Sequence, residues 1–99
     1  MRKRRNIPTI PIDFYSDGNH KEKYRGILYA SIVEGVEQSL QKNKDKFIMA
    51  RVSDGNDLKD IEILKDSFRV NLYVVLDFYE KNEEYEKCSY TLDLINQIQ

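Results

Sequence analysis

The chain has 99 residues, of which 40% are hydrophobic and 33% are charged, and its formal net charge is −1 at pH 7. This length suits one small domain with a single core and leaves no room for a separate catalytic lobe. The single cysteine excludes an internal disulfide and a cysteine-based zinc site. No apolar run approaches the roughly 20 residues of a membrane span. We therefore expect a protein of the cytoplasm, or of a virion assembled there, without membrane contact.

The net charge hides an uneven distribution along the chain. Residues 1–25 carry seven basic and three acidic side chains, whereas residues 26–99 carry nine basic and fourteen acidic ones. A protein that coats nucleic acid with its folded surface is expected to be basic throughout its body. Any contact with phosphates is therefore assigned to the start of the chain, where the cationic side chains are Arg2, Lys3, Arg4 and Arg5.

Residues 1–15 are predicted to form an extended arm, and residues 16–99 a single small helical domain. Pro8 and Pro11 favour extended or polyproline-like backbone and oppose a helix. The segment is too apolar for a free linker, so we expect it to dock on its own body or on a partner. Its candidate partner-binding residues are Arg2, Lys3, Arg4, Arg5, Ile10, Ile12, Phe14 and Tyr15.

A long helix is predicted over residues 20–43. Asn19 and Glu22 have the spacing of an N-cap and its capping-box partner. Apolar side chains recur at helical spacing and predict one buried stripe. A second line of small residues at the same spacing would let another element approach closely. The apolar stripe is Tyr24, Leu28, Ile32, Val36 and Leu40 with Ile27 beside it, and the small-residue line is Ser31, Gly35 and Ser39.

A two-stranded ribbon is predicted from residues 47–52 and 61–64, joined by a loop at 53–57. Both segments are short, apolar and bounded by turn residues. The loop superficially suggests a calcium site at Asp54, but the glycine and glutamate that an EF-hand needs at its sixth and twelfth positions are Lys59 and Lys65 here. We interpret the loop as a turn.

The pattern of residues 66–81 fits either a strand or a helix. Phe68, Val70, Leu72, Val74 and Leu76 alternate as in a strand, whereas Phe68, Leu72, Val75, Leu76 and Tyr79 share a helical face. Capping residues at Asp66 and Ser67 favour the helix. The buried phase then breaks at Asn82, which predicts two helices joined by a tight turn. The expected stripe of the second helix is Tyr85, Cys88, Leu92 and Ile95.

The predicted fold class is α+β and mainly helical. It comprises a long helix in the N-terminal half, a short two-stranded β ribbon, a C-terminal antiparallel helical hairpin and an extended N-terminal arm. The run Phe78-Tyr79-Glu80, followed by Glu84-Tyr85-Glu86-Lys87-Cys88, resembles helical hairpins of small bacteriophage and bacterial proteins. This resemblance covers about a third of the chain. It implies a phage or mobile-element origin and no particular mechanism.

The residue types that catalysis requires are scarce. His20 is the only histidine and is expected to be an exposed residue at a helix start. Cys88 is predicted to be a buried structural cysteine. The acidic residues Glu80, Glu83, Glu84 and Glu86 are interpreted as a solvated surface at a helix turn. We therefore predict that the protein is not an enzyme and that it holds no metal or cofactor.

Two functions from different classes follow from these patterns. The first is a non-enzymatic accessory protein that docks on a larger protein assembly or a neighbouring subunit, with the arm as a clasp. The second is a nucleic-acid-binding accessory protein that uses Arg2, Lys3, Arg4 and Arg5 together with Lys21, Lys23 and Arg25. A homodimer is a further prediction, because the small-residue line permits close helix approach.

Overall fold

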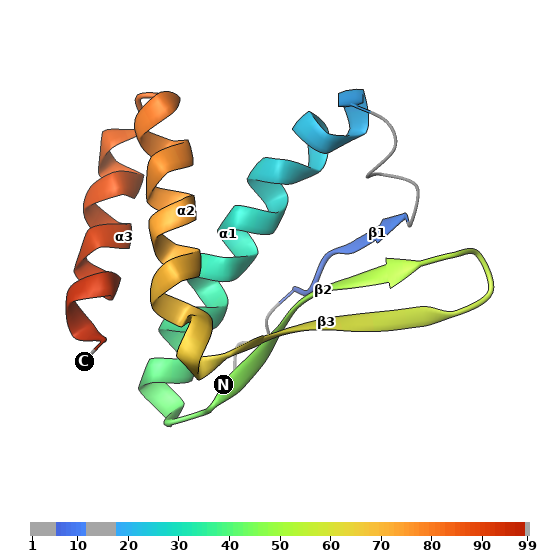
Figure 1. Ribbon diagram of the computed structural model, residues 1–99, viewed down its shortest axis with the longest axis horizontal. Coiled ribbons are helices and arrows are strands. Elements are labelled where there is room, and N and C mark those ends of the chain that lie inside the picture. The colour runs from blue at the N-terminus through green and yellow to red at the C-terminus, as the bar shows by residue number, and fades with distance from the viewer. Residues whose placement is uncertain (1–5, 12–17, 99) are drawn as a thin grey trace.

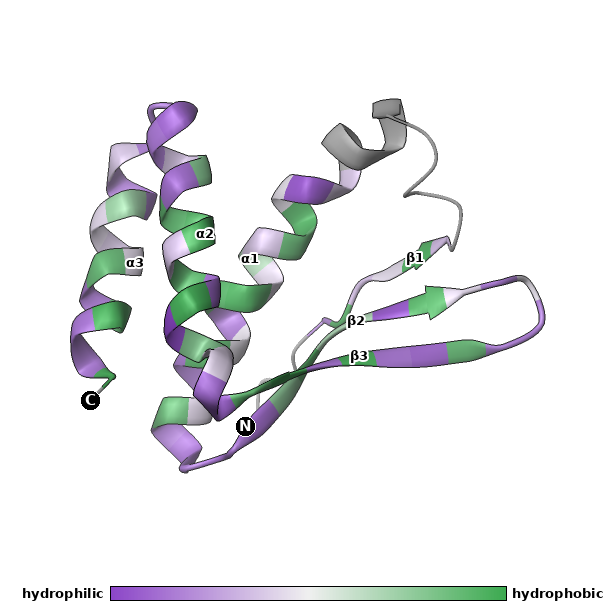
Figure 2. Ribbon diagram, viewed as in Figure 1, coloured by the Kyte–Doolittle hydropathy of each residue, from purple (hydrophilic) through white to green (hydrophobic). Residues whose placement is uncertain are grey.

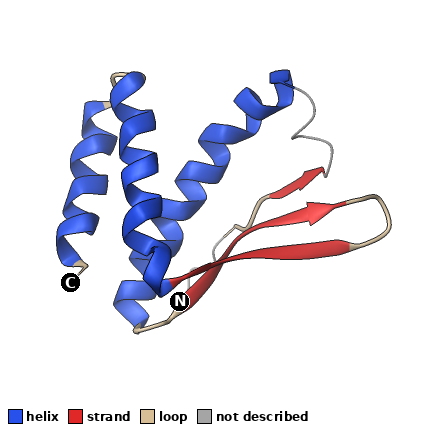
Figure 3. Cartoon of the chain, in the orientation of Figure 1, coloured by secondary structure: helices blue, strands red, loops and turns tan. Residues whose placement is uncertain are grey.

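The computed structural model describes residues 6–11 and 18–98, and the side chains of the first helix from Tyr24 onward. A short strand and a long helix are followed by two strands and then by two helices (Figures 1 and 3). The elements are β1 (Thr9–Pro11), α1 (Gly18–Lys42), β2 (Lys46–Ser53), β3 (Leu58–Leu64), the short 3₁₀ turn η2 (Lys65–Ser67), α2 (Phe68–Lys81) and α3 (Tyr85–Gln97). The α+β class is confirmed.

The sheet has three strands in the order β1-β2-β3, so the prediction of a two-stranded ribbon is wrong. β2 and β3 form the expected antiparallel pair, and β1 adds to β2 in parallel. Pro8 and Pro11 are compatible with this because β1 is a sheet edge, where a missing N–H is tolerated. The Arg51 N–H donates to the Pro8 carbonyl at 2.9 Å, and Ile10 is only 1% exposed. Part of the predicted arm is therefore a strand of the protein's own sheet.

Helix α1 lies between the sheet and the α2–α3 hairpin (Figure 1). Ile32 and Val36 face the core as predicted, whereas Ile27 is about half exposed and does not. The helix begins at Gly18, so Asn19 lies within its first turn and not at the N-cap position.

The small-residue line of α1 receives strand β2. The Phe47 ring lies against Gly35, and the Ser31 hydroxyl donates to the Met49 carbonyl at 2.6 Å. Close approach by another element is thus confirmed. The surface on which the homodimer prediction rested is occupied by the protein's own strand.

Residues 68–81 form a helix, which resolves the ambiguity between helix and strand. Hydrophobic burial decides between the two patterns, because Phe68, Leu72, Val75 and Tyr79 lie on one helical face and are all buried. Ser67 occupies the N-cap position, but its side chain makes no capping hydrogen bond. Ser67 is therefore at the predicted N-cap position, but the predicted capping hydrogen bond is not formed.

The turn between α2 and α3 lies at Asn82, as predicted. Glu83 adopts a left-handed conformation with a φ of 58°, and the Glu84 N–H donates to the Tyr79 carbonyl at 2.9 Å. This bond pattern is a Schellman motif, which satisfies the last carbonyls of a helix and reverses the chain.

The buried face of α3 differs from the predicted stripe. Thr91, Leu94 and Ile95 are buried, whereas Tyr85 and Leu92 are exposed. Thr91 can occupy a core position because its hydroxyl donates to the Lys87 carbonyl at 2.7 Å, which removes the cost of burying it. Of the predicted stripe only Ile95 is buried, and Cys88 is half-buried.

One core joins the three helices to β2. Figure 2 shows the hydrophobic segments of the helices and of β2 facing one another, and hydrophilic residues at the α2–α3 turn. Among the described residues, no helix has the length and hydrophobicity needed to cross a bilayer. The principal buried residues are Ile32, Val36, Phe47, Phe68, Leu72, Val75, Tyr79, Leu94 and Ile95.

Candidate functional site

Most residues predicted to bind a partner lie outside the described part of the chain. These are Arg2, Lys3, Arg4, Arg5, Ile12, Phe14 and Tyr15. Ile10 is described, and its side chain is buried under the sheet, so it presents no surface to a partner in this conformation. The side chains of His20, Lys21 and Lys23 are also not described, and Arg25 is half-buried.

The described part of the chain begins at Asn6 and enters the sheet beside β2. Thr9 pairs with Arg51 in parallel register. The same register counted back would set Asn6 opposite Ile48, near the start of β2. By contrast, Lys21 and Lys23 belong to the first turns of α1, toward which β1 runs. The described chain therefore enters the sheet at the opposite end of β1 from the start of α1, and residues 2–5 lie outside the described residues.

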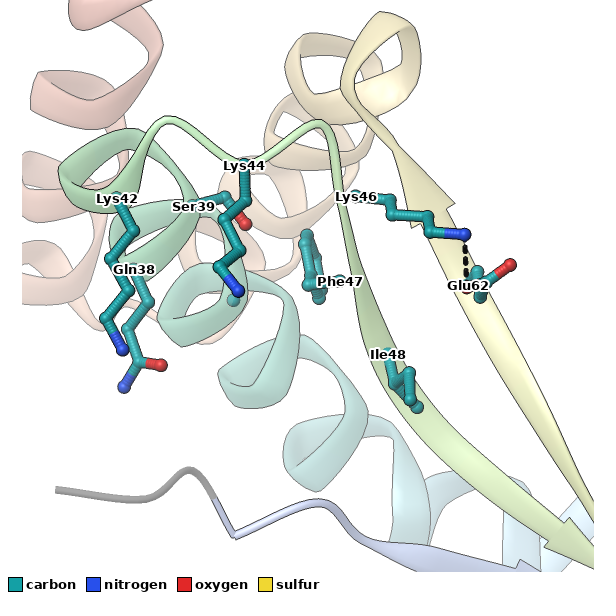
Figure 4. Close-up of a pocket in the computed structure, with 9 residues that line it drawn as sticks. Gln38, Ser39, Lys42, Lys44, Lys46, Phe47, Ile48 and Glu62 are labelled. Atoms are coloured by element: carbon teal, nitrogen blue, oxygen red, sulfur yellow. Dashed lines mark ion pairs between the residues drawn. The ribbon is translucent and has the colours of Figure 1, made fainter. Parts of the chain in front are cut away.

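A pocket of about 380 Å³ lies where α1 ends and β2 begins (Figure 4). Gly35 and Phe47 line it together with polar and charged residues from α1, the α1–β2 turn, β2 and β3. The polar and charged lining residues are Gln38, Ser39, Lys42, Lys44, Lys46 and Glu62.

The end of α1 brings these lysines together. Asn43 has a φ of 54°, and the Lys44 N–H donates to the Ser39 carbonyl at 2.9 Å. This is again a Schellman motif, and it turns the chain back over the last turn of the helix. As a result Lys42 and Lys44 line the same pocket although they lie on either side of the reversal.

The charges that line this pocket leave an excess of two cations. Lys46 is paired with Glu62 at 3.2 Å. Neither Lys42 nor Lys44 has an ion-pair partner among the described side chains. Cations at a helix C-terminus are favoured by the helix dipole, which accounts for their stability there. Their unpaired charge also makes the pocket attractive to an anion.

Ser39 adds a buried hydroxyl to this pocket. The residue is 4% exposed and lines the pocket, and Figure 4 shows its side chain extending toward Lys44 and Phe47. Its carbonyl accepts a hydrogen bond, but within the described part of the chain its hydroxyl has no partner. A buried hydroxyl without a partner costs free energy, which a bound acceptor would recover.

A second, mainly apolar pocket of about 270 Å³ lies between α1 and the hairpin. Tyr79 lines it and is 5% exposed, and burial is the main reason why the pKa of its hydroxyl is raised. Lys87 lies over the Tyr79 ring, with its Nζ 5.4 Å from the ring centroid. A phenol is already neutral at physiological pH, and the raised pKa disfavours the phenolate of Tyr79 further.

The surroundings of Cys88 raise the pKa of its thiol, whereas a reactive thiol has a lowered pKa. Desolvation, followed by the nearby carboxylates of Glu80 and Glu84, raises its pKa. A raised pKa favours the unreactive thiol over the thiolate. Among the described residues, no group of three or more potential metal ligands gathers.

The outer face of α2 carries exposed apolar side chains. Val70, Tyr73 and Val74 lie at helical spacing opposite the buried face, with Val70 60% exposed. An outward helix face is usually polar. The sequence reasoning assigned Val70 and Val74 only to the rejected strand pattern and left this surface without a role.

Sequence reasoning also missed the lysine-lined pocket. The run Lys42-Asn43-Lys44-Asp45-Lys46 indicated the end of a helix, but only the left-handed residue at Asn43 determines which of its side chains converge. The chain matches no protein-family model, no curated protein and no solved structure.

Proposed function

We propose that the protein is a non-enzymatic accessory protein that binds nucleic acid through its basic end. We define the basic end as the residues Arg2, Lys3, Arg4 and Arg5 together with Lys42 and Lys44. The observation that carries the proposal is the pocket lined by Lys42 and Lys44, two exposed lysines without ion-pair partners among the described side chains.

The placement of charge favours nucleic-acid binding over docking on a larger protein assembly, which was the first prediction from the sequence. The arm predicted to bind a protein partner includes Ile10, and this residue is buried in the protein's own sheet. Lys42 and Lys44, by contrast, are exposed and can meet phosphates. The acidic residues Glu80, Glu83, Glu84 and Glu86 lie at the α2–α3 turn, away from the end of α1 (Figure 1).

The affinity for nucleic acid should fall steeply with salt, because each phosphate contact releases counterions. Gel retardation with single- and double-stranded DNA and RNA at about 50 and 200 mM salt tests this. A variant with alanine at residues 2–5 should bind more weakly and with a smaller salt dependence. Lys81→Ala is the matched control, since Lys81 is paired with Asp77 at the other end of α2. Absence of binding at low salt contradicts the proposal.

A second candidate is docking on a larger protein assembly, which the exposed face of α2 favours. Val70, Tyr73 and Val74 are exposed apolar side chains that include one aromatic residue, and aromatic residues are enriched at protein interfaces. The partner would be a protein with a shallow apolar surface. An origin in a phage or mobile genetic element stays a prediction.

The two functions are distinguished by two variants of the full-length protein. Tyr73→Ala should reduce capture of a protein partner and leave gel retardation unchanged. Alanine at residues 2–5 should do the reverse. Both variants keep β1 intact, whereas removal of residues 1–15 would also remove a strand of the sheet.

A further inference from the structure

We propose that the pocket lined by Ser39, Lys42 and Lys44 binds a single dianionic phosphate group. This site deepens the proposed function, on which it rests only for the source of the phosphate. The source is either the terminal phosphate of a nucleic acid or free phosphate, and both present the same chemistry.

The donors in the pocket match those that a phosphate needs. Ser39 offers a hydroxyl, and Lys42 and Lys44 each offer an ammonium group. Gln38, which also lines the pocket, can donate from its side-chain amide. Two ammonium groups without ion-pair partners among the described side chains balance the nearly two negative charges of a phosphate monoester at pH 7.

Ser39 is the residue that distinguishes this pocket from a cluster of surface lysines. It is more than nine-tenths buried, and its hydroxyl has no hydrogen-bond partner in the described part of the chain. Without a ligand, the buried Ser39 hydroxyl costs free energy because it lacks a hydrogen bond. A bound phosphate would accept that hydrogen bond.

Two features of the pocket act against an anion, and both are weakened by local contacts. Glu62 contributes a carboxylate, which Lys46 neutralises at 3.2 Å. The carbonyls at the end of α1 carry partial negative charge. The Ser39 carbonyl, however, accepts the Lys44 N–H, so it is directed into the Schellman turn.

Titration of the full-length protein with inorganic phosphate tests the pocket directly. At constant ionic strength, backbone amide NMR signals of Gly35–Phe47 should shift and saturate, and the same concentration of chloride should not reproduce the shifts. Ser39→Ala and Lys44→Met should each weaken phosphate binding at least tenfold. Lys81→Met removes the same charge at a distant site and should leave phosphate affinity unchanged.

The proposed phosphate site is contradicted if phosphate does not bind, or if Ser39→Ala, Lys44→Met and Lys81→Met all bind it equally. Lys44 is exposed, so Lys44→Met should stay folded even if Ser39→Ala does not. A melting curve for each variant verifies this.

The two sources of phosphate are separated with one oligonucleotide, with and without a 5′ phosphate. Tighter binding of the phosphorylated form, lost in Lys44→Met, identifies the nucleic acid end. Equal binding of the two forms, with phosphate still bound, identifies free phosphate. If nucleic acid binds and inorganic phosphate does not, the pocket is wrong and the proposed function stands. The reverse result contradicts the proposed function alone.

Discussion

The ring of Phe47 lies against Gly35, so close that a Cβ atom added to the glycine would overlap three of its ring carbons. Phe47 also packs on Phe68, with the ring centroids 5.5 Å apart. The absence of a side chain at Gly35 thus sets how closely β2 approaches α1, and through Phe47 it positions α2.

Gly35→Ala should destabilise the protein by about 1–3 kcal/mol, because Phe47 is held on both sides and must shift. Gly26 is the matched control, since a Cβ at this exposed helical glycine would meet nothing within 4 Å. Gly26→Ala should stabilise the protein by about 1 kcal/mol. Chemical denaturation of the two variants measures both changes, and a stabilised Gly35→Ala would contradict the packing described here.

The phase of α3 is tested by two leucines two residues apart. Leu94 is 3% exposed, and Leu94→Ala should cost about 2–5 kcal/mol. Leu92 is 45% exposed, and Leu92→Ala should change the free energy of unfolding by no more than about 0.5 kcal/mol. If Leu92 were buried, as the sequence pattern predicted, Leu92→Ala would cost more than Leu94→Ala. Denaturation curves of the two variants therefore decide which face of α3 is buried.

The sequence predicted α1, α2, the hairpin turn and two of the three strands, because their apolar spacing is regular over many residues. It failed where a polar residue takes a core position. Thr91 is buried in place of Leu92, since a hydrogen bond to the Lys87 carbonyl satisfies its hydroxyl. A pattern based on apolar residues alone does not identify a buried threonine whose hydroxyl donates to a backbone carbonyl.

The edge strand and the candidate pocket were not predicted for a different reason. β1 has three residues, too few for a periodic pattern, and its pairing partner lies far along the chain. The pocket depends on the left-handed residue Asn43, which determines how Lys42 and Lys44 converge. Neither feature has a local signal in the residues that form it.

Glu83→Gly should stabilise the protein by about 1 kcal/mol. Glu83 adopts a φ of 58° in the α2–α3 turn, a conformation that costs a residue with a Cβ and costs glycine little. Glu80→Gly is the control, because Glu80 lies in the helix and glycine there should destabilise by about 1 kcal/mol. Thermal unfolding of both variants should show shifts of opposite sign.

The β2–β3 loop should weaken at acidic pH. The Asp54 carboxylate accepts the N–H groups of Asn56 at 3.0 Å and Asp57 at 2.8 Å, and these bonds lower its pKa from 3.8. A lowered pKa means that the contribution is complete above pH 3.8 and is lost as the pH falls through the folded-state value. Protection of the Asn56 amide, measured against its intrinsic exchange rate at each pH, should therefore fall at low pH.

Asp54→Asn is the matched variant for this loop, because it keeps an acceptor and cannot titrate. It should protect the Asn56 amide equally at about pH 2 and at pH 6. A wild-type amide that exchanges with the same protection at both values would show that the carboxylate does not hold the turn.

Cys88 should react slowly with iodoacetamide, because burial and the carboxylates of Glu80 and Glu84 raise the pKa of its thiol. Glu84→Gln removes one of these charges, so it should lower the thiol pKa and speed labelling at pH 8. Glu86→Gln changes the same charge at a residue that does not contribute to the shift, and it should leave the rate unchanged. Equal rates in all three proteins would contradict the electrostatic cause.

The parallel pairing of β1 with β2 has a consequence for the order of folding. β3 follows β2 directly and α3 follows α2 directly, so both pairs close short loops and form quickly. β1 is synthesised first, yet its partner emerges only after the whole of α1, and this long loop closure is slow. Until then the Ala50–Ser53 edge of β2 is unpaired and can capture another chain. We therefore expect that loss of residues 6–11 leads to aggregation before it leads to loss of helix.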